Sequence, residues 1–287
     1  MGVSAPLLLG AVAYDPKVVT IWDGFKGYFE RLDLPFDYLL YSNYERQVEA
    51  LLDGVIHVAW NSPLAWIRAR RLAVAQGRSV SALAMRDTDR DLTSVVVVRS
   101  DGPVRAIGDL RGKVVAVGAV DSPQSTLIPL AFLRERGLEP QVDFKVQRHD
   151  LLSGKHGDHI GGERDAARAL ATRRADAACM IDANHLLFAT EGTLQPGATH
   201  VLARTPAYDH CNVTVGPHAP TALVERFRTR LLEMSYADPN VRPLLDLEGL
   251  KAWREGRVEG YGVLEAAVDA LGFYDQHGRI TAPDYRY

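Results

Sequence analysis

The chain has 287 residues, of which 47% are hydrophobic and 24% charged, and a formal net charge of -3 at pH 7. This composition is that of an ordinary globular protein, and it excludes a disordered or fibrous chain. The length exceeds what one core usually fills, so two compact lobes or one large domain are expected. Basic residues do not cluster into a stripe, and we therefore expect no nucleic-acid partner.

No apolar run approaches the roughly 20 residues that are needed to span a bilayer. Residues 7–9 are apolar, but they lack the charged leader and the cleavage site of a secretory signal. We therefore expect no membrane insertion, and a chain that is cytoplasmic as given or periplasmic if a leader has been removed. Two cysteines, Cys179 and Cys211, are too few for a disulfide framework, and we expect both to be thiols.

Strands and helices alternate in the first part of the chain. Apolar runs and helical periodicity predict strands at 7–13, 36–41 and 55–60, and helices at 18–32 and 44–52. Short connections between alternating strands and helices favour parallel pairing with right-handed crossovers.

The pattern changes after residue 78, where two strands follow each other without a long helix between them. These are predicted at 79–84 and 93–99, on either side of the charged segment 86–91. A second alternating series then predicts elements at 114–117, 126–136, 144–147, 163–173, 177–181, 201–204 and 223–234. We expect a first lobe of residues 1–95 plus 206–287 and a second lobe of residues 96–205.

A largely polar turn joins the predicted strand at 114–117 to the predicted helix at 126–136. Its hydroxyl and amide side chains include Ser122, Gln124, Ser125 and Thr126. A helix N-terminus carries unpaired N–H groups and a partial positive charge, so these side chains are candidates for holding an anionic group. The alternative is that they only cap the helix.

Asn61, Ser62 and Pro63 repeat this arrangement in the first half of the chain. A strand ends at Trp60, Ser62 is a natural N-cap, and Pro63 suits the first helical position. If both strands end at one cleft, two helix N-termini converge on it and hold an anion between them. Tyr14 and Trp60, at strand ends, are the aromatic candidates for contact with an organic ligand.

Residues 149–163 form a glycine-rich segment with three histidines. His156, His159 and Glu163 are candidate metal ligands, and the two histidines are also candidate acids or bases. The histidines lack the spacing of a recognised zinc signature, and a solvated loop without a ligand is the alternative.

His210 and Cys211 place an imidazole next to a thiol where the chain is expected to return to the first lobe. Such a pair can act as a nucleophile with its base or can bind a metal ion. Neighbours on a strand point to opposite faces, so we expect that the two side chains do not both face the cleft. A small buried cysteine is the alternative.

Several segments resemble the phosphate and phosphonate branch of the type II periplasmic solute-binding proteins, and the resemblance covers most of the chain. They are residues 58–63, 107–116, 125–126 and 165–176. The resemblance implies a two-lobed α/β fold with a ligand cleft between the lobes. It also implies that the ligand touches both helix-start turns, through Asn61, Ser62, Gln124, Ser125 and Thr126. Leu127 stands where the family pattern has a glycine.

The leading hypothesis is reversible binding of a small anionic, phosphorylated or phosphonate-like organic molecule in the cleft. The cofactor is unknown, and binding requires none; an ABC transporter permease is a partner only if the chain is exported. The alternative is a cytoplasmic enzyme of a lyase or biosynthetic type on the same fold. It would use His156, His159, His210 or Cys211, with or without a metal ion.

Overall fold

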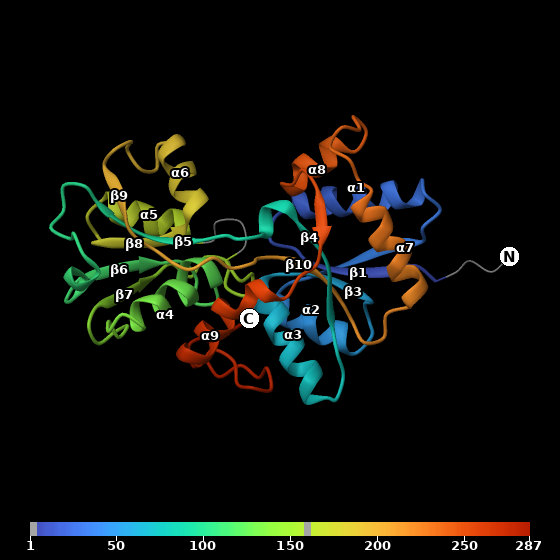
Figure 1. The fold of residues 1–287 in the computed structure, drawn as a ribbon, viewed down its shortest axis with the longest axis horizontal. Coiled ribbons are helices and arrows are strands. Elements are labelled where there is room, and N and C mark those ends of the chain that lie inside the picture. Colours follow the sequence, from blue (N-terminus) through green and yellow to red (C-terminus); the bar gives the residue numbers. More distant parts are fainter. Residues whose placement is uncertain (1–4, 158–161) are drawn as a thin grey trace. The chain divides into compact units, whose positions relative to one another are not determined.

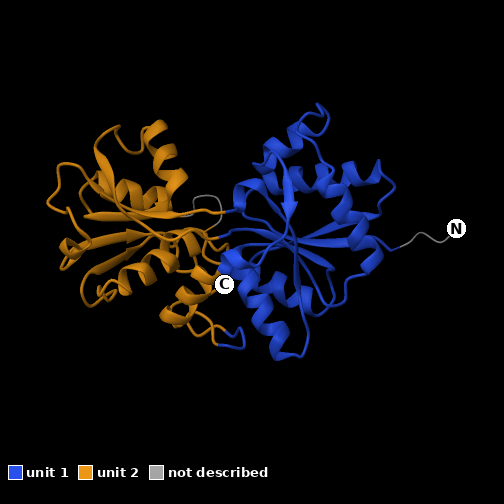
Figure 2. Ribbon diagram, viewed as in Figure 1, with its two compact units in different colours: residues 1–90, 209–261, 276–279 blue, residues 91–208, 262–275, 280–287 orange. Residues whose placement is uncertain are grey.

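The computed structural model describes residues 5–157 and 162–287 and contains two compact units, coloured separately in Figure 2. Unit 1 comprises Met1–Arg90, Asp209–Tyr261 and Gln276–Arg279, and unit 2 comprises Asp91–Tyr208, Gly262–Asp275 and Ile280–Tyr287. The expected division at residues 95 and 206 differs from this one in the C-terminal part, most of which belongs to unit 2 after residue 261.

Unit 1 contains a mixed sheet with helices on both faces (Figure 1). Its strands are β1 (Leu7–Val12), β2 (Phe36–Tyr41), β3 (Val58–Asn61), β4 (Ser81–Arg86), β10 (Asn212–Val215) and β11 (Trp253–Glu255). Its helices are α1 (Lys17–Glu30), α2 (Tyr44–Leu52), α3 (Pro63–Ala75), α7 (Thr221–Leu232) and α8 (Arg242–Glu248). The described strands have the order β11-β4-β10-β3-β1-β2. β1 pairs in parallel with β2 and β3, as expected, whereas β10 runs antiparallel to both of its neighbours.

The alternation of side chains along β1 sends apolar groups to both faces of this sheet. Leu7, Leu9 and Ala11 pack in a core with α1, α7 and α8. Val12 packs on the opposite face with α2 and α3. Because successive strand residues point to opposite faces, this almost wholly apolar run is typical of a strand that helices cover on both sides.

Unit 2 repeats the same design. Its strands are β5 (Ser94–Arg99), β6 (Val114–Val117), β7 (Lys145–Arg148), β8 (Ala177–Ile181) and β9 (Thr199–Arg204). Its helices are α4 (Ile128–Arg134), α5 (Glu163–Ala171), α6 (Asp182–Thr190) and α9 (Gly262–Leu271). The described strands have the order β7-β6-β8-β5-β9, with β5 antiparallel to β8 and β9. In β5, Val96 and Val98 pack with α4, whereas Val95 and Val97 pack with α5 and α6.

The predicted strands at 36–41, 114–117 and 177–181 are confirmed residue for residue. The third strand begins at Val58 rather than at residue 55, because residues 53–57 form a turn with Gly54 at a φ of +75°. Among the described helices, none is long and apolar enough to cross a membrane.

Replacing Phe29 by Ala should destabilise unit 1 by about 3–5 kcal/mol, the usual loss for a buried phenylalanine. Phe29 is fully buried, and its ring centroid lies 4.9 Å from that of Phe36 and 5.1 Å from that of Phe227. All four tryptophans of the chain, Trp22, Trp60, Trp66 and Trp253, lie in unit 1, so tryptophan fluorescence during urea unfolding follows this unit.

The matched control is Val74→Ala, since Val74 on α3 is 72% exposed and should change stability by at most about 0.5 kcal/mol. Equal effects of the two substitutions would contradict the assignment of Phe29 to the core.

Candidate functional site

The polar turn after β6 caps a helical segment in unit 2. A π-helical turn at Pro123–Leu127 leads directly into α4, so the helix begins earlier than residue 126. The Oγ atom of Ser122 accepts hydrogen bonds from the Ser125 N–H at 3.3 Å and from the Ser125 hydroxyl at 2.7 Å. Ser122 is therefore the N-cap, and the expected capping role of this turn is confirmed for that residue.

Two polar atoms of this turn are buried without a hydrogen-bond partner among the described residues. They are Oε1 of Gln124 and Oγ1 of Thr126, whose residues are only 4% and 3% exposed. Leaving a buried polar atom unpaired costs about 1–3 kcal/mol, so such atoms in a native fold need an explanation. A ligand that reaches them provides one, and simple capping does not.

The hydroxyl-bearing Thr126 also lines a cavity of about 390 Å³ within unit 2. Val120, Leu130 and Phe273 form part of its apolar wall, and Arg148 contributes a guanidinium group. Gln141 and Asp284 add further polar groups, so the cavity combines apolar and polar surface.

The segment 154–157 packs directly on this turn. The Asp121 carboxylate accepts hydrogen bonds from the backbone N–H groups of Gly154 at 2.6 Å and His156 at 3.1 Å. The Gln124 amide nitrogen donates to the Gly157 carbonyl at 2.9 Å. A Cβ atom at Gly157, whose φ is +68°, would lie 2.3 Å from the Ser122 hydroxyl, so only glycine allows this approach.

Of the residues predicted as metal ligands in this region, His156 and Glu163 are both buried, and His159 lies outside the described residues. The Glu163 carboxylate accepts hydrogen bonds from the Ile181 N–H at 3.0 Å and the Asn184 amide at 2.8 Å. Within the described ranges, the structure does not bring His156 and Glu163 together in a metal-binding group.

In unit 1 the corresponding turn follows β3. Ser62 accepts a hydrogen bond from the Ala65 N–H at 3.1 Å, and Pro63 occupies the first turn of α3, so the predicted cap is confirmed. The Asn61 amide accepts from Gln47 at 2.8 Å and donates to Thr214 at 2.9 Å. These bonds tie β3 to α2 and β10, and contact of Asn61 and Ser62 with a ligand stays a prediction.

The two aromatic candidates differ in their surroundings. Trp60 belongs to the unit 1 core, where its ring meets Trp253 edge-on at 5.6 Å and Arg86 lies 5.2 Å from its centroid. Tyr14 is half-buried, and the ammonium group of Lys17 lies 5.9 Å from its ring.

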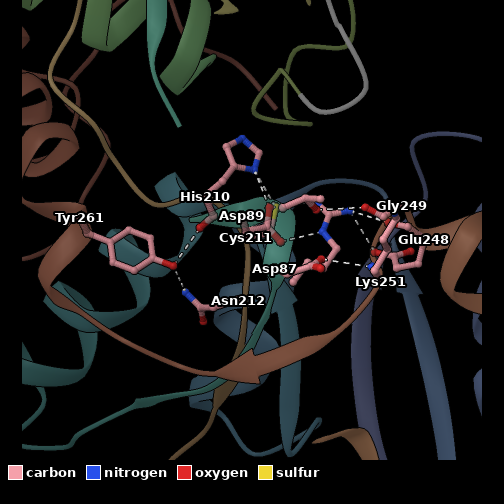
Figure 3. A network of polar contacts seen from close by, with 11 residues as sticks. Asp87, Asp89, His210, Cys211, Asn212, Glu248, Gly249, Lys251 and Tyr261 are labelled. Carbon is pink, nitrogen blue, oxygen red and sulfur yellow. Dashed lines mark hydrogen bonds and ion pairs between the residues drawn. The ribbon is translucent and has the colours of Figure 1, made fainter. Parts of the chain in front are cut away.

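A second group of chemically active side chains lies in unit 1 (Figure 3), and only two of its members, His210 and Cys211, were predicted as candidates. Asp89, His210 and Cys211 are all buried, and one ligand atom from each lies within 4.8 Å of the others. The His210 Nδ1 atom is 3.1 Å from the Cys211 sulfur and 3.5 Å from Oδ1 of Asp89.

Arg86 holds the Asp89 carboxylate in place. Its Nε and Nη2 atoms donate to the two carboxylate oxygens at 2.6 and 2.9 Å. Burial by itself raises the pKa of Asp89, but the Arg86 guanidinium outweighs it and holds the pKa at about 2. Asp89 is therefore ionised throughout the neutral range.

The side chains of His210 and Cys211 approach each other, so they do not point to opposite faces of a strand, and whether both face the cleft stays untested. The strand β10 begins only at Asn212, so the alternation of a strand does not apply to the two residues before it. Their main chain is fixed instead by the hydrogen bond from the His210 N–H to the Asp89 carbonyl at 2.8 Å. The Tyr261 hydroxyl also donates to the His210 carbonyl at 2.9 Å.

Asp89 and Arg86 were not predicted as site residues. The available signal for these two residues was the charged segment 86–91 between two apolar strands. Within that segment the structure buries Asp89. Neither cysteine is in a disulfide, as expected. Cys179 in unit 2 is an inert thiol, because burial raises its pKa to about 12.

Comparison with known proteins confirms the expected fold and resemblance. PhnD1 from Prochlorococcus marinus in complex with methylphosphonate is 18% identical and has a TM-score of 0.68, covering 93% of this chain and 98% of that chain. XAC2383 from Xanthomonas citri bound to ATP is 17% identical with a TM-score of 0.70, at the same coverage. The aliphatic sulphonate binding protein SsuA from Escherichia coli is 15% identical with a TM-score of 0.59, covering 99% and 94%. At these identities the comparison shows that the chain has the same fold as these three proteins.

The family model extends over most of the chain, and it is described as that of the phosphonate ABC transporter's periplasmic substrate-binding protein. It matches residues 11–261, which include both helix-start turns and the Asp89, His210 and Cys211 group. The chain therefore belongs to the family of periplasmic substrate-binding proteins of phosphonate ABC transporters.

Proposed function

We propose that the chain binds a small organic phosphonate, as its singly protonated anion, at the turn of residues 122–127 in unit 2. The family supports a phosphonate ligand, and one structural neighbour was solved with methylphosphonate. The observation that carries the proposal is the pair of buried polar atoms, Gln124 Oε1 and Thr126 Oγ1, that have no partner among the described residues.

The start of the helical segment suits a negatively charged group. Helix N-termini carry a partial positive charge and N–H groups that point toward a ligand, and they are recurrent sites for phosphate-like anions. The Thr126 hydroxyl adds a donor at the same turn, whereas the Ser125 hydroxyl donates to Ser122 and holds it in place. The net negative charge of a phosphonate is therefore matched without a cationic side chain in the turn.

The orientation of the Gln124 amide adds a requirement on the ligand. Its nitrogen donates to the Gly157 carbonyl, so the amide oxygen is the atom that is left for the ligand. An amide oxygen only accepts hydrogen bonds, so its partner has to be a donor. A phosphonate with one P–O–H group supplies that donor, whereas an alkylsulfonate is fully ionised and has none.

In the transporter, the bound phosphonate is passed to an ABC permease, and the protein works in the periplasm. Family membership supports both statements. The comparisons give no support to the alternative of a cytoplasmic enzyme on this fold.

Replacing Ser125 and Thr126 together by Ala should weaken methylphosphonate binding by about 1–3 kcal/mol, measured by isothermal titration calorimetry. The reason is the loss of the Thr126 donor to a charged group and of the Ser125 hydroxyl that holds Ser122 in the turn. The matched control replaces Thr172, the C-cap of α5, and Thr190, the last residue of α6, which are exposed and donate to backbone carbonyls one turn earlier. An unchanged affinity in the Ser125 and Thr126 variant would remove this turn from the site.

Methylphosphonate should bind at least about 100-fold more tightly than methanesulfonate, because a site built around a donor rejects analogues that lack it. In the Gln124→Leu variant, which has no acceptor oxygen, the preference should shrink. Competition calorimetry with the two anions measures both ratios. Equal affinities in the native protein would contradict the role of the Gln124 oxygen.

Gly157→Ala should weaken methylphosphonate binding, since the added methyl group displaces residue 157 from Ser122 and breaks the Gln124 bond to its carbonyl. Gly108→Ala is the control in the same unit, because a Cβ atom there meets nothing within 4 Å. Thermal unfolding of both variants separates a local effect on affinity from loss of the fold. If both variants bind equally well, the segment 154–157 does not support the site.

A further inference from the structure

We propose that Asp89, His210 and Cys211 form a binding site for a thiophilic divalent transition-metal ion of the Zn²⁺ class. The three side chains come from two segments that lie side by side, the 3₁₀ turn at Asp87–Asp89 and the residues just before β10 (Figure 3). They offer a carboxylate oxygen, an imidazole nitrogen and a thiolate sulfur. This mixed set suits Zn²⁺, whereas Mg²⁺ and Ca²⁺ prefer oxygen ligands alone.

The spacing of the ligand atoms fits a tetrahedral ion. With the usual Zn–N, Zn–O and Zn–S bond lengths, neighbouring ligand atoms lie about 3.3–3.6 Å apart. The observed separations are 3.1 Å from His210 Nδ1 to the Cys211 sulfur and 3.5 Å from the same nitrogen to Oδ1 of Asp89. The third separation, between sulfur and oxygen, is at most 4.8 Å.

Acidic side chains gather around the three candidate ligands. Arg86 contacts two buried carboxylates, those of Asp89 and Glu248. The adjacent Asp209 forms a bidentate pair with Arg257.

An independent observation comes from the other nitrogen of the imidazole. The Nε2 atom of His210 is buried and has no hydrogen-bond partner among the described residues. A metal-binding histidine coordinates through one nitrogen and donates a proton from the other to a neighbouring group. With Nδ1 on the ion, Nε2 is left as a donor for a water molecule or an anion near the site.

The surrounding residues would hold the ligands in position. Arg86 orients the carboxylate, and each carboxylate oxygen has lone pairs for both the guanidinium and an ion. The main chain at residue 210 is fixed by hydrogen bonds to Asp89 and from Tyr261. Supporting hydrogen bonds of this kind are typical of metal sites.

The test is titration of the reduced, chelator-treated full chain with Co²⁺, followed by displacement with Zn²⁺. A Cys211 thiolate bound to Co²⁺ gives a ligand-to-metal charge-transfer band in the near ultraviolet, and one ion should bind per chain. Cys211→Ser should abolish the band, and His210→Ala should weaken Co²⁺ binding by more than about tenfold. Cys179→Ser is the matched control, because that buried thiol lies in unit 2 outside the group, and it should leave the band intact.

Circular dichroism of each variant establishes that it is folded. The Co²⁺ absorption spectrum of the unaltered protein tests the proposal even if a variant unfolds. Absence of the charge-transfer band in the unaltered protein would overturn the proposal. So would a band that persists in folded Cys211→Ser protein or disappears in Cys179→Ser. The readout is independent of phosphonate binding, so failure of one proposal leaves the other intact.

Discussion

Burial of polar side chains at the ends of strands is the constraint on which both candidate sites depend. Water is excluded from these groups, so nearly all of them need partners within the protein. The Asp121 carboxylate meets this need with backbone N–H groups, and Asp89 meets it with Arg86. Gln124 Oε1 and His210 Nε2 are among the buried polar atoms that have no partner in the described part of the chain. The first needs a ligand that donates a hydrogen bond, and the second is left as a donor beside the proposed ion site.

Much of the scaffold was predictable because its signals are local. Apolar runs predicted most strands of both sheets but not β10 and β11, and the cap at Ser62 with Pro63 was predictable from two adjacent residues. The polar turn at 122–126 was recognised as a helix start for the same reason. Its contact with the segment 154–157 was not, since the close approach at Gly157 depends on how the chain folds back.

The group at Asp89 shows what local patterns miss. Asp89 and His210 are separated by the first segment of unit 2, and no periodicity in the sequence relates them. The alternation of side chains along a strand also does not describe His210 and Cys211, because β10 begins only at Asn212. In the same way, the apolar face of α9 does not reveal that this helix packs in unit 2.

The position of β10 in its sheet also sets an order of events during synthesis. β3 and β4 are joined only through β10, which lies between them in the unit 1 sheet. All strands of unit 2, from Ser94 to Arg204, leave the ribosome before β10 does. At about 5–20 residues per second, β4 waits roughly 6–25 s for its partner. When β10 emerges, the strands of unit 2 have all been made, while in unit 1 one edge of β3 and both edges of β4 are still unpaired, because β11 follows later. Such open strand edges are the surfaces that chaperones have to protect.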